Sequence, residues 1–116
     1  MQPNLGDVAK VAKLTERIFK LKTKQFRLKI RHEEVMEEMK KLGYDVTEGP
    51  DTMGIEKFGE LTSEKMKGMT NEARSRFFEL QLIGLDIEAE MTAYQLEIKD
   101  AGDELIKMLQ KLRGEQ

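Results

Sequence analysis

The sequence predicts an all-α protein in which two long helices form an antiparallel coiled-coil hairpin, with one or two short helices in the connecting segment. Three observations predict this fold. Apolar residues recur with heptad spacing in two long stretches. Glycine and proline, which interrupt helices, are concentrated between these stretches. Charged residues make up 36% of the chain and aromatic residues 6%, a balance that favours long helices over a compact enzyme core.

The first long helix is expected over residues 5–42. Heptad positions are lettered a to g, and the a and d positions form the seam that faces a partner helix. The d residues are Leu14, Leu21, Leu28, Val35 and Leu42, and the a residues are Val11, Ile18, Gln25, His32 and Met39. Asn4 can cap the start of this helix, and Gly43 stands where a left-handed C-terminal cap would sit. The seam is apolar except at Gln25 and His32, which can fix the register at some cost in stability.

The connecting segment, residues 43–69, contains five of the nine glycines and Pro50. Residues 43–51 are expected to form a loop. One or two short helices are expected after it, because Met53, Ile55 and Phe58 begin a new apolar pattern.

The second long helix is expected over residues 70–113. Its a residues are Phe77, Gly84, Met91, Ile98, Leu105 and Leu112, and its d residues are Leu80, Ile87, Tyr94, Ala101 and Met108. Thr70 or Asn71 can cap its start, and Gly114 can end it. Each long helix would extend about 55–65 Å. Neither helix can bury its own seam, so the two are expected to pair within one domain, residues 1–116.

The two halves of the chain carry opposite charge. Residues 1–31 contain nine Lys and Arg and two Asp and Glu, a net charge of +7, whereas residues 32–116 carry −9. Lys10, Arg17, Lys24 and Arg31 occupy g positions of the first helix, and Glu90, Glu97 and Glu104 occupy g positions of the second. In an antiparallel pair these rows face each other, which favours pairing of the two helices.

Two registers satisfy the charges. The preferred one sets Lys24 beside Glu90. The other, shifted by one heptad, sets Gln25 across from Tyr94 but brings Lys10 to Lys111.

Apolar residues outside the seam predict self-association. Leu5, Ala12, Phe19 and Phe26 form a stripe at b positions of the first helix, and the stretch 77–87 is apolar on more than one face. A helix that is apolar on two sides is covered on two sides, so we expect a homo-oligomer, with a dimer favoured. The expected interaction residues are Tyr44, Met53, Ile55, Phe58, Phe77, Phe78, Leu82 and Leu85.

The predicted function is that of a non-enzymatic, self-associating interaction protein, such as an adaptor, chaperone, scaffold or docking inhibitor, with another protein as a further partner. Nucleic-acid binding by the basic helix 10–31 is an alternative, because residues 20–31 include six cations. The acidic helix is expected to neutralise several of these cations, which favours an internally matched flank over a nucleic-acid site.

A second alternative rests on carboxylates. Glu33, Glu34 and Glu37 form a Glu-Glu-x-x-Glu pattern, and Asp100 and Asp103 precede an apolar run. Together they resemble the magnesium-binding helices of all-α nucleoside triphosphate pyrophosphatases of the MazG type, although Asp100 replaces a Glu of that family. The resemblance implies that each cluster would hold Mg²⁺ through oxygen atoms. In an antiparallel hairpin the clusters would lie roughly 30 Å apart, so only a second subunit could unite them.

Other chemistries lack the residues that they need. The chain has no cysteine, and His32 is its only histidine. A single histidine is a poor basis for a metal site, so His32 is better interpreted as a seam residue. No phosphate-binding glycine loop or nucleophile elbow is present. We therefore expect no catalytic residue, cofactor or resident metal. No apolar run is long enough to span a membrane, and no signal peptide is recognised, so a cytoplasmic location is expected.

Overall fold

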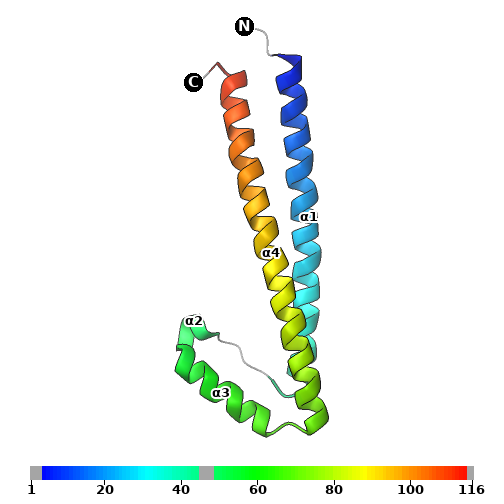
Figure 1. Ribbon diagram of the computed structural model, residues 1–116, viewed down its shortest axis with the longest axis vertical. Coiled ribbons are helices and arrows are strands. Elements are labelled where there is room, and N and C mark those ends of the chain that lie inside the picture. The colour runs from blue at the N-terminus through cyan, green and yellow to red at the C-terminus, as the bar shows by residue number, and fades with distance from the viewer. Residues whose placement is uncertain (1–3, 45–48, 115–116) are drawn as a thin grey trace. The chain divides into compact units, whose positions relative to one another are not determined.

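The computed structural model describes residues 4–44 and 49–114, and of Pro50 only the backbone. Its elements in chain order are α1 (Leu5–Lys41), α2 (Pro50–Met53), α3 (Ile55–Lys67) and α4 (Asn71–Leu112) (Figure 1). No strand occurs among the described residues. The all-α prediction is confirmed, and each predicted long helix agrees with α1 or α4 to within one residue at either end.

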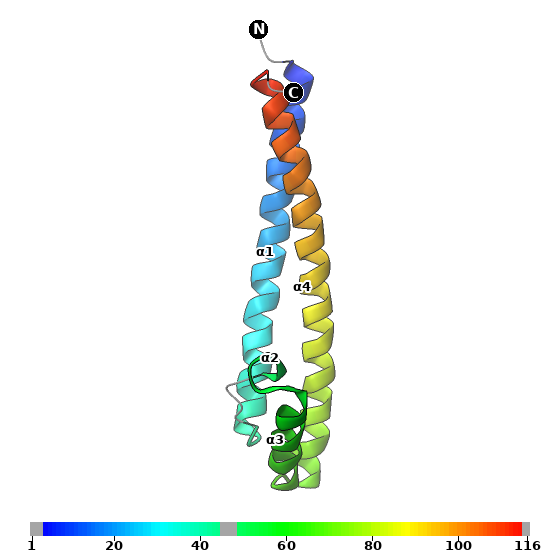
Figure 2. The same ribbon diagram turned by 90° about the vertical axis from the view of Figure 1, so that its left-hand side faces the viewer.

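The chain divides into two compact units, each described separately. The first unit comprises residues 1–29 and 89–116, and the second comprises residues 30–88. In each unit a segment of α1 packs antiparallel against a segment of α4, as both views show (Figure 2). The predicted helical hairpin is confirmed, whereas supercoiling of the two helices stays a prediction.

Burial along α1 and α4 follows the predicted heptads. All 21 predicted a and d residues are buried or half-buried. The deepest of them are Leu14, Leu21, Val35, Met39, Phe77, Leu80, Ile87 and Ala101. A fully buried apolar side chain of this size contributes about 1.5–3 kcal/mol, so this seam is the main source of stability.

The helix ends use the predicted caps. The backbone N–H of Gly6 donates to Asn4 Oδ1 at 2.7 Å, and the N–H of Ala73 donates to Thr70 Oγ1 at 3.1 Å. Gly43 has a φ of +104°, and the N–H groups of Gly43 and Tyr44 donate to the carbonyl oxygens of residues 40 and 39. This pattern is a Schellman cap, in which glycine takes the left-handed position at no steric cost.

The cap at Gly43 turns Tyr44 back into the core of the second unit. The Tyr44 side chain is buried, and its ring centre lies 4.7 Å from that of Phe77, which is fully buried. The Tyr44 hydroxyl lies 3.1 Å from Thr62 Oγ1, a hydrogen bond that ties α3 to this core. The expectation that Tyr44 and Phe77 belong to an interaction surface is therefore wrong. The segment from 45 to 48, part of the predicted loop, lies outside the described residues.

The helix register differs from the preferred prediction. In the first unit Gln25 Nε2 donates to the carbonyl oxygen of Met91 at 3.4 Å and to Gln95 Oε1 at 3.0 Å. These contacts place Gln25 across from Tyr94, whose ring centre lies 5.8 Å from Lys24 Nζ. This is the shifted register, and the preference for Lys24 beside Glu90 was wrong.

Asp7 explains why the shifted register is tolerated. This register brings the basic N-terminal part of α1 close to Lys111, and like charges repel each other. Asp7, at a d position, is instead nearly buried, and its Oδ2 lies 3.3 Å from Lys111 Nζ. The carboxylate pairs with the lysine and offsets the repulsion.

Glu38 and Arg76 form a bidentate ion pair between α1 and α4 in the second unit. Arg76 Nε donates to Glu38 Oε1 at 2.8 Å and Nη2 donates to Oε2 at 3.0 Å, while Nη1 donates to Glu79 Oε2 at 2.9 Å. The hydrogen bonds from Arg76 lower the pKa of Glu38 and, with those to Glu79, raise the pKa of Arg76. Both side chains are more than two-fifths exposed, so solvent screens the pair.

The adjacent phenylalanines test how far the seam controls stability. Phe77 is fully buried and Phe78 is 50% exposed. Phe77→Ala should lower the free energy of unfolding by about 3–5 kcal/mol, the usual cost of truncating a buried aromatic. Phe78→Ala, the matched control, should cost far less in the same urea unfolding experiment. Equal losses in the two variants would contradict the assigned seam.

The Glu38–Arg76 pair should make part of the stability depend on pH. Because the pKa of Glu38 is lowered in the folded state, its contribution is present above the ordinary glutamate pKa of about 4.3 and is lost as pH falls through the folded value. Glu38→Gln should therefore be slightly less stable than the natural chain at pH 7. Thermal unfolding followed by circular dichroism should show this difference shrinking below about pH 4, and a difference independent of pH would refute the assignment.

Candidate functional site

One flank of the first unit exposes a group of large apolar side chains. Phe19 and Phe26 are 72% and 62% exposed. The other exposed large apolar side chains of this unit are Leu5 and Val8 from α1 and Leu96, Ile106 and Leu109 from α4. Six of them occupy b or e positions, which lie on one flank of the seam, and Leu96 occupies an f position, on the outer surface next to that flank. Because e positions face each other in an antiparallel pair, the seven side chains share one side of the unit. We call this set the apolar face.

The opposite flank of α1 is basic. Every c and g position from residue 10 to residue 27 carries an exposed lysine or arginine. We call this set, which consists of Lys10, Lys13, Arg17, Lys20, Lys24 and Arg27, the basic stripe. Lys13, Arg17, Lys20 and Lys24 also line an open groove of about 370 Å³, together with Glu16 and Leu21.

The second unit carries a separate group of exposed apolar residues. The predicted interaction residues Phe78, Leu82 and Leu85 are 50–65% exposed on α4, and Ile55 is 82% exposed on α3. Met53 and Phe58 are half-buried. The structure adds Ile30 and Met36 from α1, which occupy e or f positions like the exposed residues of the first unit.

Sequence reasoning missed part of both apolar groups. The stripe at b positions of α1 was recognised, but Leu96, Ile106 and Leu109 of α4 were not singled out. The heptad positions of these three residues could have revealed them, because each is an apolar residue on the same side of the helix pair as Phe19 and Phe26. The apolar residues of α4 beyond residue 87 are spaced widely, so the face that they complete becomes visible only when the two helices are paired.

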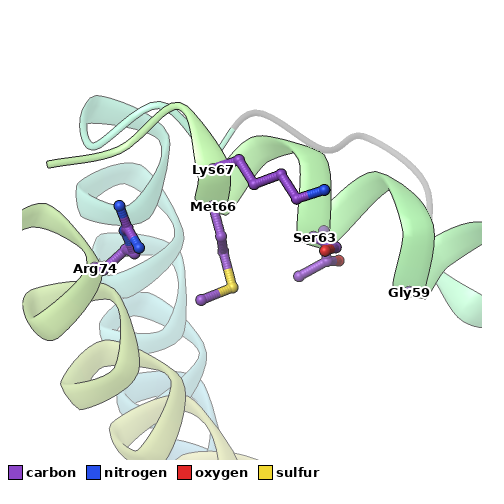
Figure 3. Close-up of a pocket in the computed structure, with 6 residues that line it drawn as sticks. Gly59, Ser63, Met66, Lys67 and Arg74 are labelled. Atoms are coloured by element: carbon purple, nitrogen blue, oxygen red, sulfur yellow. The ribbon is translucent and has the colours of Figure 1, made fainter. Parts of the chain in front are cut away.

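A hollow of about 340 Å³ lies where α3 approaches the start of α4. Figure 3 shows Gly59, Ser63, Met66 and Lys67 of α3 and Arg74 of α4 around it, and Thr62 completes the lining. Arg74 donates from Nε and Nη2 to the carbonyl oxygen of Met69 at 3.3 and 3.2 Å. Its guanidinium therefore holds the turn before α4 in place, and the hollow has no carboxylate or histidine in its lining.

The acidic residues and His32 do not assemble a metal centre among the residues that the structure describes. Glu33, Glu34 and Glu37 line an open groove of about 480 Å³, with Ile30, Glu38 and Lys41. The other acidic cluster, Asp100 and Asp103, belongs to the other unit. His32 Nε2 lies 3.1 Å from Glu88 Oε1, and its side chain is 29% exposed, as expected of a polar seam residue.

Comparison with models of protein families, with curated proteins and with solved structures finds no match to this chain. Across residues 4–44 and 49–114, each helix is either too short or too polar to cross a lipid bilayer.

Proposed function

We propose that this chain is a non-enzymatic, self-associating interaction protein whose apolar face packs against the same face of a second copy. The observation that supports the proposal is the gathering of seven exposed large apolar side chains on one side of the first unit. Contiguous exposed apolar surface on a soluble protein usually marks a place where another molecule binds.

A second copy is a suitable occupant because the apolar face has the form of a helix-pair surface. Two antiparallel helices that expose apolar residues along one side can pack on an identical pair to give a four-helix bundle, in which the exposed stripes form the core. Two-fold symmetry is the commonest arrangement of identical chains, and it places the same patch on both sides of the interface.

The energetics favour an interface that uses several of these side chains together. Association costs an estimated 4–15 kcal/mol in lost freedom of movement. Burying one exposed Phe or Leu side chain completely contributes about 1.5–3 kcal/mol. No single residue offsets the cost, but Phe19 and Phe26 with Leu96 and Ile106, contributed by both copies, supply enough apolar surface to do so.

The exposed residues of the second unit would serve a second role. Ile55 on α3, and Phe78, Leu82 and Leu85 on α4, are not needed by a dimer formed through the apolar face. We propose that they dock another protein, which fits the action of an adaptor, chaperone, scaffold or docking inhibitor.

Self-association is tested by placing charges in the apolar face. The natural chain should sediment as a dimer in the micromolar range. Phe19→Glu combined with Phe26→Glu should sediment as a monomer with unchanged helix content, since both side chains are exposed within one chain. Ala93→Glu, on the other flank of α4, adds a charge at an exposed position and should stay dimeric. A natural chain that is monomeric throughout this range would refute the proposal.

Docking of another protein is tested separately in the second unit. Phe78→Glu or Phe58→Glu should reduce capture of protein partners from the native host while leaving helix content largely unchanged. Phe78→Glu should also leave the sedimentation of the dimer unaltered if the two roles use different surfaces. Capture that is unchanged in both variants would remove these residues from the proposal.

A further inference from the structure

We propose that the basic stripe binds the phosphate backbone of a nucleic-acid duplex. This inference concerns the flank of α1 opposite the apolar face and does not depend on self-association. The six cations alternate in steps of three and four residues, which keeps them on one side of a helix over roughly 26 Å. No uncharged side chain interrupts the row of c and g positions from Lys10 to Arg27.

The structure leaves most of these charges without a carboxylate partner. The sequence had favoured an internally matched flank, in which the acidic g row of α4 neutralises the cations. Among the described residues, Lys20 is the one member of the stripe with a carboxylate within 4 Å, Glu16 Oε1 at 3.0 Å. Lys24 lies over the Tyr94 ring instead of pairing with a glutamate. A row of exposed, uncompensated cations is the electrostatic feature that attracts a polyanion.

The acidic residues of α4 restrict where a polyanion can lie. Glu90, Glu97, Asp100 and Glu104 are exposed on the neighbouring flank. They repel phosphate and confine it to the α1 side. The first unit nevertheless has a net positive charge of +4, from twelve Lys and Arg and eight Asp and Glu, so the unit as a whole attracts a polyanion.

The chemistry of the stripe fits a duplex better than the other polyanions of a cell. Proteins that bind single strands place aromatic side chains among their cations so that bases can stack on them. Helices that lie on membranes place apolar side chains beside their cations. The basic stripe has one aromatic neighbour, Tyr94, which is half-buried beneath Lys24. Phe19 and Phe26 occupy the other flank, so no row of exposed aromatic or apolar side chains lies among the cations. A duplex carries one phosphate charge per roughly 1.7 Å of its axis, and binding to these phosphates requires no contact with the bases. Lys13, Arg17, Lys20 and Lys24 line an open groove, so a duplex can reach their charged groups.

The test measures binding of a fluorescent 20-base-pair duplex by anisotropy at several salt concentrations. The stripe variant combines Arg17→Gln with Lys24→Gln. The matched control combines Lys22→Gln with Lys29→Gln, which removes the same charge from e positions of the same helix. Glutamine keeps a high helix propensity, and circular dichroism verifies that both variants fold.

The natural chain should bind with a slope of log affinity against log salt near −5, about 0.9 for each of six contacts. The stripe variant should lose about 60-fold in affinity at 0.1 M salt, and its slope should become less negative by roughly two. The control should change only a few-fold.

Four results would overturn the inference. The first is the absence of duplex binding at low salt, and the second is an equal loss of duplex affinity in the stripe variant and the control. The third is tighter binding of a single strand of the same length. The fourth is binding to phosphatidylserine vesicles that depends on the stripe, without duplex binding. The last result would assign the stripe to a membrane surface.

Discussion

Burial of the heptad seam between α1 and α4 is the constraint on which the rest of the structure depends. The seam occupies the a and d positions of both helices, and every other position is assigned to a flank by its spacing from them. Residues at b, e and f lie on one side and residues at c and g on the other. The contrast between Phe19 and Lys20, neighbours in sequence with opposite surroundings, is therefore a direct result of which residues are buried.

Charge has a smaller part in this structure than its abundance suggests. An exposed ion pair contributes about 0.2–1 kcal/mol, less than one buried leucine. The seam therefore holds the helices together although, among the described residues, Lys10, Arg17 and Lys24 form no ion pair with the acidic g row. The polar contacts that join α1 to α4 involve residues in or beside the seam, whereas Lys20 pairs with Glu16 within α1. Gln25 donates to Gln95 and, in a partly buried hydrogen bond, to the carbonyl oxygen of Met91. Asp7, which is buried, pairs with the exposed Lys111.

Much of the fold could be predicted from the sequence, because heptad spacing and capping residues act locally. Asn4, Gly43 and Thr70 each perform the capping role that their residue types favour. The register could not be predicted, because heptad spacing allows both alternatives, and the contacts that distinguish them, Gln25 with Gln95 and Asp7 with Lys111, are tertiary. Burial of Tyr44 was missed for a similar reason, since the cap that turns this side chain toward Phe77 had been assigned only the role of ending a helix. The apolar face was predicted on α1 and missed on α4, although both halves obey one spacing rule.

The unbroken row of cations at c and g has a consequence for how this chain can change in evolution. A single residue inserted between Leu14 and Leu21 would rotate the following part of α1 by about 100°. The cations after that point would turn relative to the seam, and apolar residues would leave it. Length changes in α1 and α4 are therefore tolerated only as matched additions or losses of seven residues. The connecting segment from 43 to 69 carries no heptad repeat, so variation in length should concentrate there, apart from the positions that hold Tyr44, Thr62 and Met69 against the core.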